Sequence, residues 1–225
     1  MEAKKGRRKM KKFELTTEFI TNAFGKKLFR IKALVKFGDV KAGELGGYVE
    51  KEENVSQDGN AWVYGNAEVS GNARVFGNAE VSSNAQVCGD AQVCGDAKVC
   101  GNAKLCSNAW VFGNAEVSGN ATVYNSAWVF GNAEVSGNAK VSGNAQVSGN
   151  TDYALAQGFG TKFRCTTFYR GKNKKIMVNC GCFHGDLEGF RKQVKETRSG
   201  KIAKEYLMIA DLMENHFASE DSSDE

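Results

Sequence analysis

Apolar and polar positions repeat at a fixed interval through the middle of the chain. From Ala61 to Asn150, each unit of six residues follows the pattern A-x-V-x-G-N with few departures. Fifteen units follow one another without an insertion, and their aliphatic positions run from Val63 to Val147, with Leu105 as the one leucine. Residues two apart point to the same side of a strand, so Ala and Val share one side and the variable x residues the other. A helix would need apolar residues at spacings of three and four, which this stretch lacks.

The Gly-Asn pair that ends each unit predicts a corner. Glycine takes positive φ freely, and Asn tolerates the left-handed region better than most residues. Four residues of strand and two of corner make one flat side, and three sides close a coil of eighteen residues. The sequence therefore predicts a mainly β protein with a triangular parallel β-solenoid of about five to six coils.

These residues resemble the hexapeptide-repeat family. Val63 and Ala67 fit that family's aliphatic residue and the small residue four positions later, and so do the pairs that follow as far as Val147. The resemblance implies a left-handed parallel β-helix; the period alone does not give the hand. It implies little about chemistry, because enzymes and inert scaffolds share the fold.

A second resemblance is to uncharacterised phage and prophage hexapeptide proteins of Gram-positive bacteria. It is carried by "FGDVKAGELGGYVEKEENVSQDGNAWVYGNA", and near the C-terminus by "NCGCFHGDLEGF". It implies an origin in a phage or prophage and carries no known activity.

Composition shifts divide the rest of the chain. Val49 and Val55 keep the interval of six, but two extra residues precede Val63, so an irregular first rung is expected. Before it, two β-like runs flank "NAFG", which predicts a hairpin that could cover the open first coil. The predicted organisation is a basic disordered tail (1–12), a β-hairpin cap (13–44), the hexapeptide β-helix (45–150), a C-terminal ββαα domain (151–218) and an acidic tail (219–225).

The C-terminal segment predicts two strands and two helices. The runs 161–170 and 174–183 are β-like and are separated by "GKN". One helix is expected from the N-cap Asp186 to Gly200. The second is expected to place one apolar face inward, made of Ile202, Tyr206, Ile209, Leu212, Met213 and Phe217.

Charge is distributed unevenly although the net charge is only +4. The first 44 residues hold 13 Lys or Arg against 5 Asp or Glu, whereas 45–150 hold 5 against 10. The basic tail could contact nucleic acid, through Lys4, Lys5, Arg7, Arg8 and Lys9, but it lacks interleaved aromatics and a solvated tail is favoured. No apolar run is long enough to cross a membrane and no secretory signal is present, so we expect a cytoplasmic protein, in the bacterial host if phage-encoded.

Sorting the outward residues by eighteen gathers aromatic side chains on one side. The face through Val75 receives five of the eight outward aromatics of the repeat. The predicted binding face consists of Arg74, Phe76, Trp110, Phe112, Trp128 and Phe130. Two Trp and two Phe on adjacent coils exceed the apolar patch that a monomer normally exposes. Three partners could bury this face. They are a second copy of the chain in a homo-oligomer, for which a trimer is favoured, a host macromolecule, and the chain's own C-terminal domain.

Candidates for catalysis are few. The acyltransferases and carbonic anhydrases of the hexapeptide-repeat family, which this chain resembles, use histidine. This chain has only His184 and His216, both outside the repeat. A zinc triad on the coils is thereby excluded. His184 remains a weak candidate for a general base at a site between subunits. Because the coils contain no histidine, we do not expect an enzyme, and if the protein is one we expect an acyltransferase. No cofactor is expected.

The seven cysteines suggest reduced thiols rather than a disulfide framework. Cys180, Cys182 and His184 are a candidate zinc site, with Cys165 as a further ligand on the partner strand. The candidate is weak, because two or more residues usually separate paired zinc-binding cysteines. A nucleophilic Cys–His pair has no visible third residue. The four cysteines of the repeat should point outward on three faces and act as structural residues: Cys88, Cys94, Cys100 and Cys106. Cys88 and Cys106 should lie one above the other, and a redox role is left open for this pair.

The sequence therefore favours a non-enzymatic binding or assembly protein that uses the aromatic face, with antagonism of host defence as one role. Two alternatives stay open. One is an acyl- or acetyltransferase with a site between subunits, and the other is an oligomer that sequesters a small ligand or nucleotide.

Overall fold

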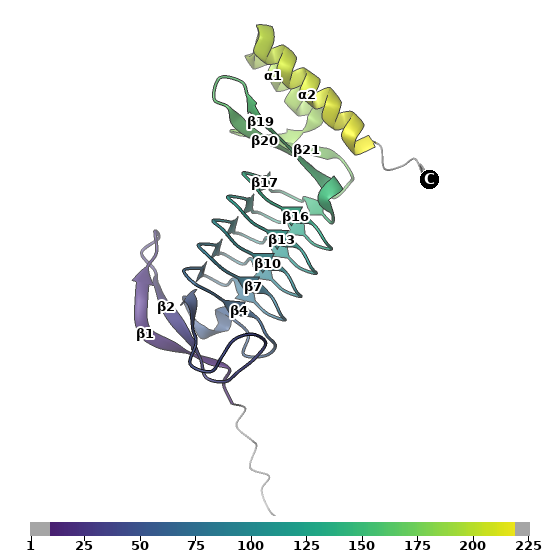
Figure 1. Ribbon diagram of the computed structural model, residues 1–225. Coiled ribbons are helices and arrows are strands. Elements are labelled where there is room, and N and C mark those ends of the chain that lie inside the picture. The colour runs from purple at the N-terminus through teal and green to yellow at the C-terminus, as the bar shows by residue number, and fades with distance from the viewer. Residues whose placement is uncertain (1–9, 219–225) are drawn as a thin grey trace, which may run out of the picture.

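The protein is an elongated body with three parts stacked along one axis (Figure 1). The computed structural model describes residues 10–218. An antiparallel N-terminal cap stands at one end, a three-sided β-solenoid forms the middle, and a small α+β domain stands on the last coil. The mainly β class and the solenoid predicted from the repeat are confirmed.

Each side of the solenoid is a parallel sheet of very short strands. The neighbour of a strand in its sheet is always the strand three units further along the chain, which is the predicted interval of eighteen residues. The first face contains β4 Trp62–Val63, β7 Glu80–Val81, β10 Lys98–Val99, β13 Glu116–Val117 and β16 Glu134–Val135. The second contains β5 Glu68–Val69, β8 Gln86–Val87, β11 Lys104–Leu105, β14 Thr122–Val123 and β17 Lys140–Val141. The third contains β6 Arg74–Val75, β9 Gln92–Val93, β12 Trp110–Val111, β15 Trp128–Val129 and β18 Gln146–Val147.

The corners take the conformation that the Gly-Asn pair predicts. The corner glycines from Gly65 to Gly143 have positive φ, for example 68° at Gly101, and where the glycine is replaced the residue keeps that conformation, as at Ser83 with 62°. Gly149, after the last strand of the solenoid, is extended instead, with a φ of −153°. Corner asparagines also form ladders in which a side-chain amide donates to the carbonyl oxygen of the side chain one coil on. In one such pair, the Nδ2 of Asn102 lies 3.1 Å from the Oδ1 of Asn120.

The core of the solenoid is a stack of alanines and valines. Every repeat alanine from Ala61 to Ala145 and every repeat valine is at most 1% exposed, and so is Leu105. Strand alternation explains this, because the Ala and Val of each unit point into the coil and the residues between them point out. Burial of aliphatic side chains, worth roughly 1.5–3 kcal/mol for each Val, is what stabilises such short strands.

The irregular first rung exists as expected. β3 (Leu45–Val49) pairs with β5 in parallel, so that Val49 stacks on Val69, and Val55 forms a bridge with Val75. A short 3-10 helix, η1 (Glu52–Asn54), turns the chain between them. Both stacked pairs are twenty residues apart instead of eighteen, so the two extra residues are taken up in the loop before Val63.

The predicted N-terminal hairpin is present. β1 (Phe13–Thr21) pairs with β2 (Lys27–Ala33), and β2 pairs with β3, so the hairpin extends the sheet of the second face and covers its parallel edge. The predicted tail 1–12 differs in its last residues: Lys12 is 4% exposed, and its Nζ donates to the carbonyl oxygen of Ala61 at 2.8 Å. Residues 1–9, including the five candidate nucleic-acid contacts, and the acidic tail 219–225 lie outside the described residues.

The C-terminal domain has more strands than its sequence predicts. The two expected strands are β20 (Arg164–Arg170) and β21 (Ile176–Cys180). They are flanked by β19 (Tyr153–Phe159) and β22 (Phe183–Asp186) in one antiparallel sheet. These outer strands were missed because both contain glycine and have little β-branched character, and pairing with the inner strands is what holds them.

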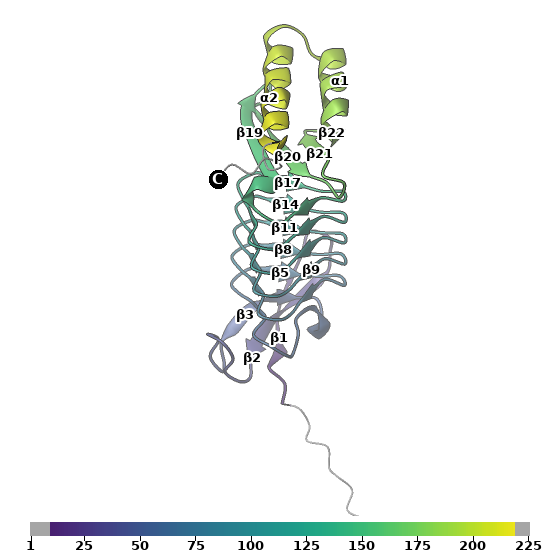
Figure 2. The same ribbon diagram turned by 90° about the vertical axis from the view of Figure 1, so that its right-hand side faces the viewer.

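Two helices cover one side of this sheet, side by side (Figure 2). α1 (Leu187–Thr197) begins after Asp186, whose side chain accepts a hydrogen bond from the Gly189 amide as an N-cap. α2 (Gly200–Ala218) buries Tyr206, Ile209, Met213 and Phe217, but Leu212 is 61% exposed and the prediction that it lies inward is wrong. Leu212 follows Met208 by one helical turn, and both lie on the exposed side of α2. No helix in residues 10–218 is long and apolar enough to cross a membrane.

Candidate functional site

Four stacked rings form an aromatic ladder on the third face, which we define as Trp110, Phe112, Trp128 and Phe130. β12 and β15 are parallel neighbours in register, so each ring stands directly beside its counterpart one coil on. The two indoles stack with centroids 5.6 Å apart and planes 14° apart, and the two Phe rings at 5.2 Å and 7°. Edge contacts join the columns, since Phe112 meets Trp128 at 6.1 Å. The parallel register predicted from the interval of eighteen thus produces one continuous aromatic surface.

Arg74 and Phe76 lie on the same face but apart from the ladder. β6 pairs with β9, so Gln92 and Cys94 occupy the coil between them and Trp110. The Arg74 guanidinium lies over the Phe76 ring at 5.6 Å from its centroid. The predicted binding face is therefore a ladder of four rings and a separate Arg–Phe pair.

The ladder is open to solvent in the single chain. Trp110 is 36% exposed and Trp128 38%, although each indole is stacked on the other. The C-terminal domain stands on the last coil (Figure 1), and both indoles stay more than a third exposed, so the alternative in which this domain covers the aromatics is wrong. Its β20 packs on β17 and β18, because the open edge of the last coil offers hydrogen-bonding groups that the third face does not.

Trp62, unlike Trp110 and Trp128, is covered by another part of the chain. It occupies an outward position on the first coil, as predicted, yet it is fully buried. The rings of Phe13 and Phe37 in the N-terminal cap meet it edge-on at 5.8 and 5.3 Å. The chain thus covers the outward Trp of its first coil and leaves the two on the third face uncovered.

The outward positions around the ladder are polar and uncharged. On the third face the neighbouring coils contribute Gln92 and Cys94 on one side, and Gln146 and Ser148 on the other. Arg74 is the one charged residue among the outward strand positions of this face. The surface combines an aromatic centre with uncharged neighbours in its own sheet, and two acidic residues, Asp90 and Asp96, are in the corners on either side of β9. An aromatic centre that lacks charged residues is typical of the buried centre of a protein interface.

His184 belongs to the contact between the C-terminal sheet and the last coil. It lies on β22 opposite Asn179, and its Nε2 is 3.1 Å from the hydroxyl oxygen of Tyr169. A Cβ added at Gly143, in the corner after β17, would lie 3.3 Å from the imidazole ring. That corner joins β17 of the second face to β18 of the third face at the end of the solenoid, so the weak candidate base packs on the last coil and is not part of the aromatic ladder.

The three candidate metal ligands do not converge. Cys180 accepts a hydrogen bond from Thr166 Oγ1, at 3.2 Å from its sulfur, and lines a cavity under the helices. His184 is opposite Asn179, the residue next to Cys180, and side chains alternate along a strand, so Cys180 and His184 point to opposite sides of the sheet. Cys182 is exposed in the turn between them. Within residues 10–218 no three His, Cys, Asp or Glu side chains are grouped as metal ligands would be.

The four solenoid cysteines are free thiols that point outward on three faces, as predicted. Cys88 and Cys106 follow Val87 and Leu105, which are paired in register, so the two thiols are neighbours. A hydrogen bond with Cys88 lowers the pKa of Cys106 to about 7 and raises that of Cys88. Burial raises the pKa of Cys94 and that of Cys100. Cys106 is therefore the thiol in the solenoid that most readily becomes a thiolate.

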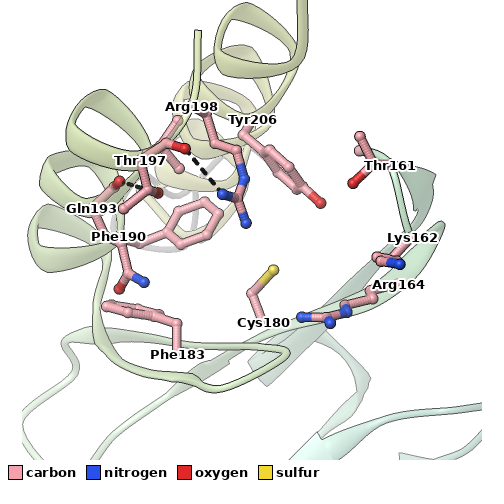
Figure 3. A pocket seen from close by; sticks show the side chains of 12 residues that line it. Thr161, Lys162, Arg164, Cys180, Phe183, Phe190, Gln193, Thr197, Arg198 and Tyr206 are labelled. Carbon is pink, nitrogen blue, oxygen red and sulfur yellow. Dashed lines mark hydrogen bonds between the residues drawn. The ribbon is translucent and has the colours of Figure 1, made fainter.

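The C-terminal domain contains a cavity of about 280 Å³ that the sequence did not indicate. It lies between the sheet and the loop joining α1 to α2, and Arg164, Cys180, Arg198 and Tyr206 point into it (Figure 3). These residues are spread over 43 positions of chain in different elements and form no motif. They share neither residue type nor spacing, so no sequence pattern could have grouped them.

The comparisons with known proteins concern the repeat. No curated protein matches the chain significantly. A family model described as YdcK Beta solenoid repeat matches residues 115–131, which span β13, β14 and β15, one strand from each face. Together with the uninterrupted hexads and the three-sided solenoid, this match fits a hexapeptide-type repeat β-helix family.

Proposed function

We propose that the protein is a non-enzymatic binding or assembly solenoid and that the aromatic ladder is its working surface. The first occupant we propose is a second copy of the chain, in a homo-oligomer. The observation that carries the proposal is the ladder itself, four rings stacked in two columns, with two exposed indoles and two half-buried Phe rings.

Energetics support an interface at this surface. Aromatic side chains each bury about 150–250 Å² when covered, and Trp is among the residues most enriched at the energetic centre of interfaces. The rings are already held in place by stacking on their neighbours, so little side-chain entropy is lost when a partner covers them. The outward strand positions next to the ladder on the third face carry no charge, so a partner that covers the ladder and these positions desolvates no ion there.

A second copy is supported by the shape of the molecule. The third face is a flat parallel sheet of five strands, and the same surface is available on every copy. Symmetric self-association repeats one contact and needs no second gene product. The resemblance to hexapeptide-repeat proteins, which commonly associate through one face, supports a trimer.

A host macromolecule is the alternative occupant. The resemblance to phage and prophage hexapeptide proteins supports it, and with it a role against host machinery. This reading uses the same ladder, so one pair of substitutions tests both.

The test replaces Trp110 and Trp128 with Ala together. We expect the wild type to have a mass in solution that is a multiple of 24.4 kDa, and the double variant to be reduced to 24.4 kDa by light scattering. The matched control is Phe24→Ala with Phe163→Ala, which removes two rings that are 81% and 71% exposed and lie outside the third face. Circular dichroism should show the same β-rich fold in all three proteins, because the substituted rings lie outside the core.

The outcomes separate the two occupants. A monomeric wild type that retains one host macromolecule, while the double variant loses it, would replace the second copy by a host partner. Identical masses and identical partner recovery for wild type and double variant would contradict the proposal as a whole.

A further inference from the structure

The cavity in the C-terminal domain has the chemistry of a ligand site, independently of the aromatic ladder. It is roofed by the ends of α1 and α2 and floored by β20 and β21 (Figure 3). At about 280 Å³ it is close to the lower end of the range for small-molecule sites.

Three cationic side chains line the cavity and no acidic one does: Lys162, Arg164 and Arg198. Lys162 is in the turn before β20, Arg164 begins that strand, and Arg198 caps the end of α1. None of the three forms an ion pair with any acidic residue in the part of the chain that the structure describes. The Arg198 Nη1 donates to the carbonyl oxygen of Thr197 at 3.0 Å, which orients its guanidinium and leaves its remaining N–H groups for an anion.

The wall across the cavity from Arg164 is aromatic and also carries Arg198 (Figure 3). Phe183 and Phe190 are in contact with centroids 5.6 Å apart, and Phe190 meets Tyr206 edge-on at 5.9 Å. The hydroxyl of Tyr206 donates to the carbonyl oxygen of Phe159 at 3.2 Å, which fixes its ring at the mouth. A planar apolar group would therefore contact the rings, with Arg198 beside them and Arg164 across the cavity (Figure 3).

Two glycines leave room for side chains that line the cavity; Gly160 lines it itself, and Gly181 lies next to Arg164 outside the lining. A Cβ at Gly160 would lie 2.5 Å from the Tyr206 hydroxyl oxygen, and one at Gly181 would collide with the Arg164 guanidinium. Both glycines also have positive φ, 69° and 63°. The side chains that define the cavity can hold their positions only because these two residues lack one.

We propose that this cavity binds a small aromatic phosphate monoester. Guanidinium groups match the oxygens of phosphate, and three unpaired cations favour a dianion over a singly charged carboxylate. The aromatic wall supplies a stacking or edge contact for the ring of the ligand. No chemical step is implied.

The test is calorimetric titration of the full-length protein with phenyl phosphate, and with adenosine 5′-monophosphate as a larger member of the class. We expect a dissociation constant below about 1 mM for at least one of them. Phenol and inorganic phosphate, which each carry half of the ligand, should bind at least about tenfold more weakly. Equal affinity for inorganic phosphate, or no binding of either ester, would overturn the proposal.

The variant is Arg164→Gln with Arg198→Gln, and the matched control is Lys195→Gln with Lys204→Gln. Both pairs remove two positive charges from exposed positions of the same domain, but only the first pair lines the cavity. We expect the arginine pair to weaken ester binding by about tenfold or more, and the lysine pair to leave it within about twofold. Equal losses in both would indicate a general charge effect and overturn the assignment to this cavity.

Cys180 provides an independent test of location. It lines the cavity, whereas Cys182 does not and is exposed. Saturating phenyl phosphate should slow alkylation of Cys180 severalfold while alkylation of Cys182 continues unchanged, as followed by mass spectrometry. Unchanged alkylation of Cys180 under saturating ligand would place the ligand elsewhere and contradict the proposal.

Discussion

At the residue scale, the corners depend on positions that lack a side chain. A Cβ at Gly101 would lie 2.9 Å from the backbone nitrogen and oxygen of Gly119 on the next coil. Not every corner is so tight, since Ser83 already has a side chain at a φ of 62°. The repeat tolerates substitution only where the next coil leaves room.

We predict that Gly101→Ala destabilises the fold by roughly 1–3 kcal/mol. An alanine in the left-handed region costs about 1–2 kcal/mol, and the contact with Gly119 adds to it. Ser83→Ala is the control, because it keeps a Cβ where one already exists, and it should change stability by less than about 0.5 kcal/mol. Denaturation midpoints in urea measure both, and equal midpoints for the two variants would show that the corner is not strained.

Thiol reactivity is the second property decided by single residues. The pKa of Cys106 is lowered to about 7 by its hydrogen bond with Cys88, whereas burial raises the pKa of Cys94 and of Cys100. At pH 7.5 we expect iodoacetamide to modify Cys106 first among the four solenoid cysteines.

The control for that reaction is Cys88→Val, which removes the hydrogen-bonding partner. Cys106 should then react severalfold more slowly, and peptide mass spectrometry over a time course gives each rate. Faster modification of Cys94 or Cys100 than of Cys106 in the wild type would contradict the assignment.

At the element scale, β1 is attached to the solenoid through a buried lysine. Lys12 immediately precedes β1, donates to the carbonyl oxygens of Ala61 and Gly59, and lies over the Phe37 ring at 4.7 Å. Burial lowers its pKa to about 8, against a smaller opposing effect of Asp58. The folded state thus releases the proton of Lys12 at a lower pH than the unfolded state, for which the ordinary value is 10.5.

The sign of the resulting pH dependence follows from proton counts. Between pH 8 and about 10.5 the unfolded chain keeps the Lys12 proton and the folded chain does not, so the contribution of Lys12 to stability rises with pH in this window. We predict that the wild type gains stability relative to Lys12→Met between pH 8 and pH 10. Urea midpoints of both proteins at pH 7, 8, 9 and 10 measure the difference, and a constant difference would contradict the lowered pKa.

The C-terminal elements show how far local pattern reaches. The helix cap at Asp186 and both helices were predicted, because capping and the apolar stripe are properties of neighbouring residues. β19 and β22 were not, because their stability comes from pairing with β20 and β21 across the sheet.

At the scale of the whole molecule, the two ends of the solenoid are closed in different ways. The N-terminal cap extends one face and buries Trp62, while the C-terminal sheet stacks on the last coil through β20. Both closures hide edges that would otherwise invite end-to-end association. The third face is left as the open surface.

The three tryptophans report on this arrangement separately. We predict that acrylamide quenches Trp110 and Trp128 in dilute protein and that Trp62 stays protected, because the cap buries it fully. The double variant Trp110→Phe with Trp128→Phe leaves Trp62 alone and should be nearly unquenched, whereas Trp62→Phe should retain the quenching. If copies associate through the ladder, quenching of the Trp62→Phe protein should fall as its concentration rises, and a fully quenched Trp62 would contradict the cap.

The sequence by itself determined the solenoid, its interval of eighteen residues, its three faces and the aromatic columns. Those features follow from a repeat of identical local units, in which each strand and corner is specified by its own six residues and the register by stacking Val on Val. Tertiary structure alone decided which Trp is covered, that Cys180 and His184 point apart, and that Arg164 and Arg198 line one cavity. These features depend on contacts between segments far apart in the chain, for which no local periodicity exists. Long-range packing therefore decides whether residues of the same type, such as the three Trp, are buried or exposed.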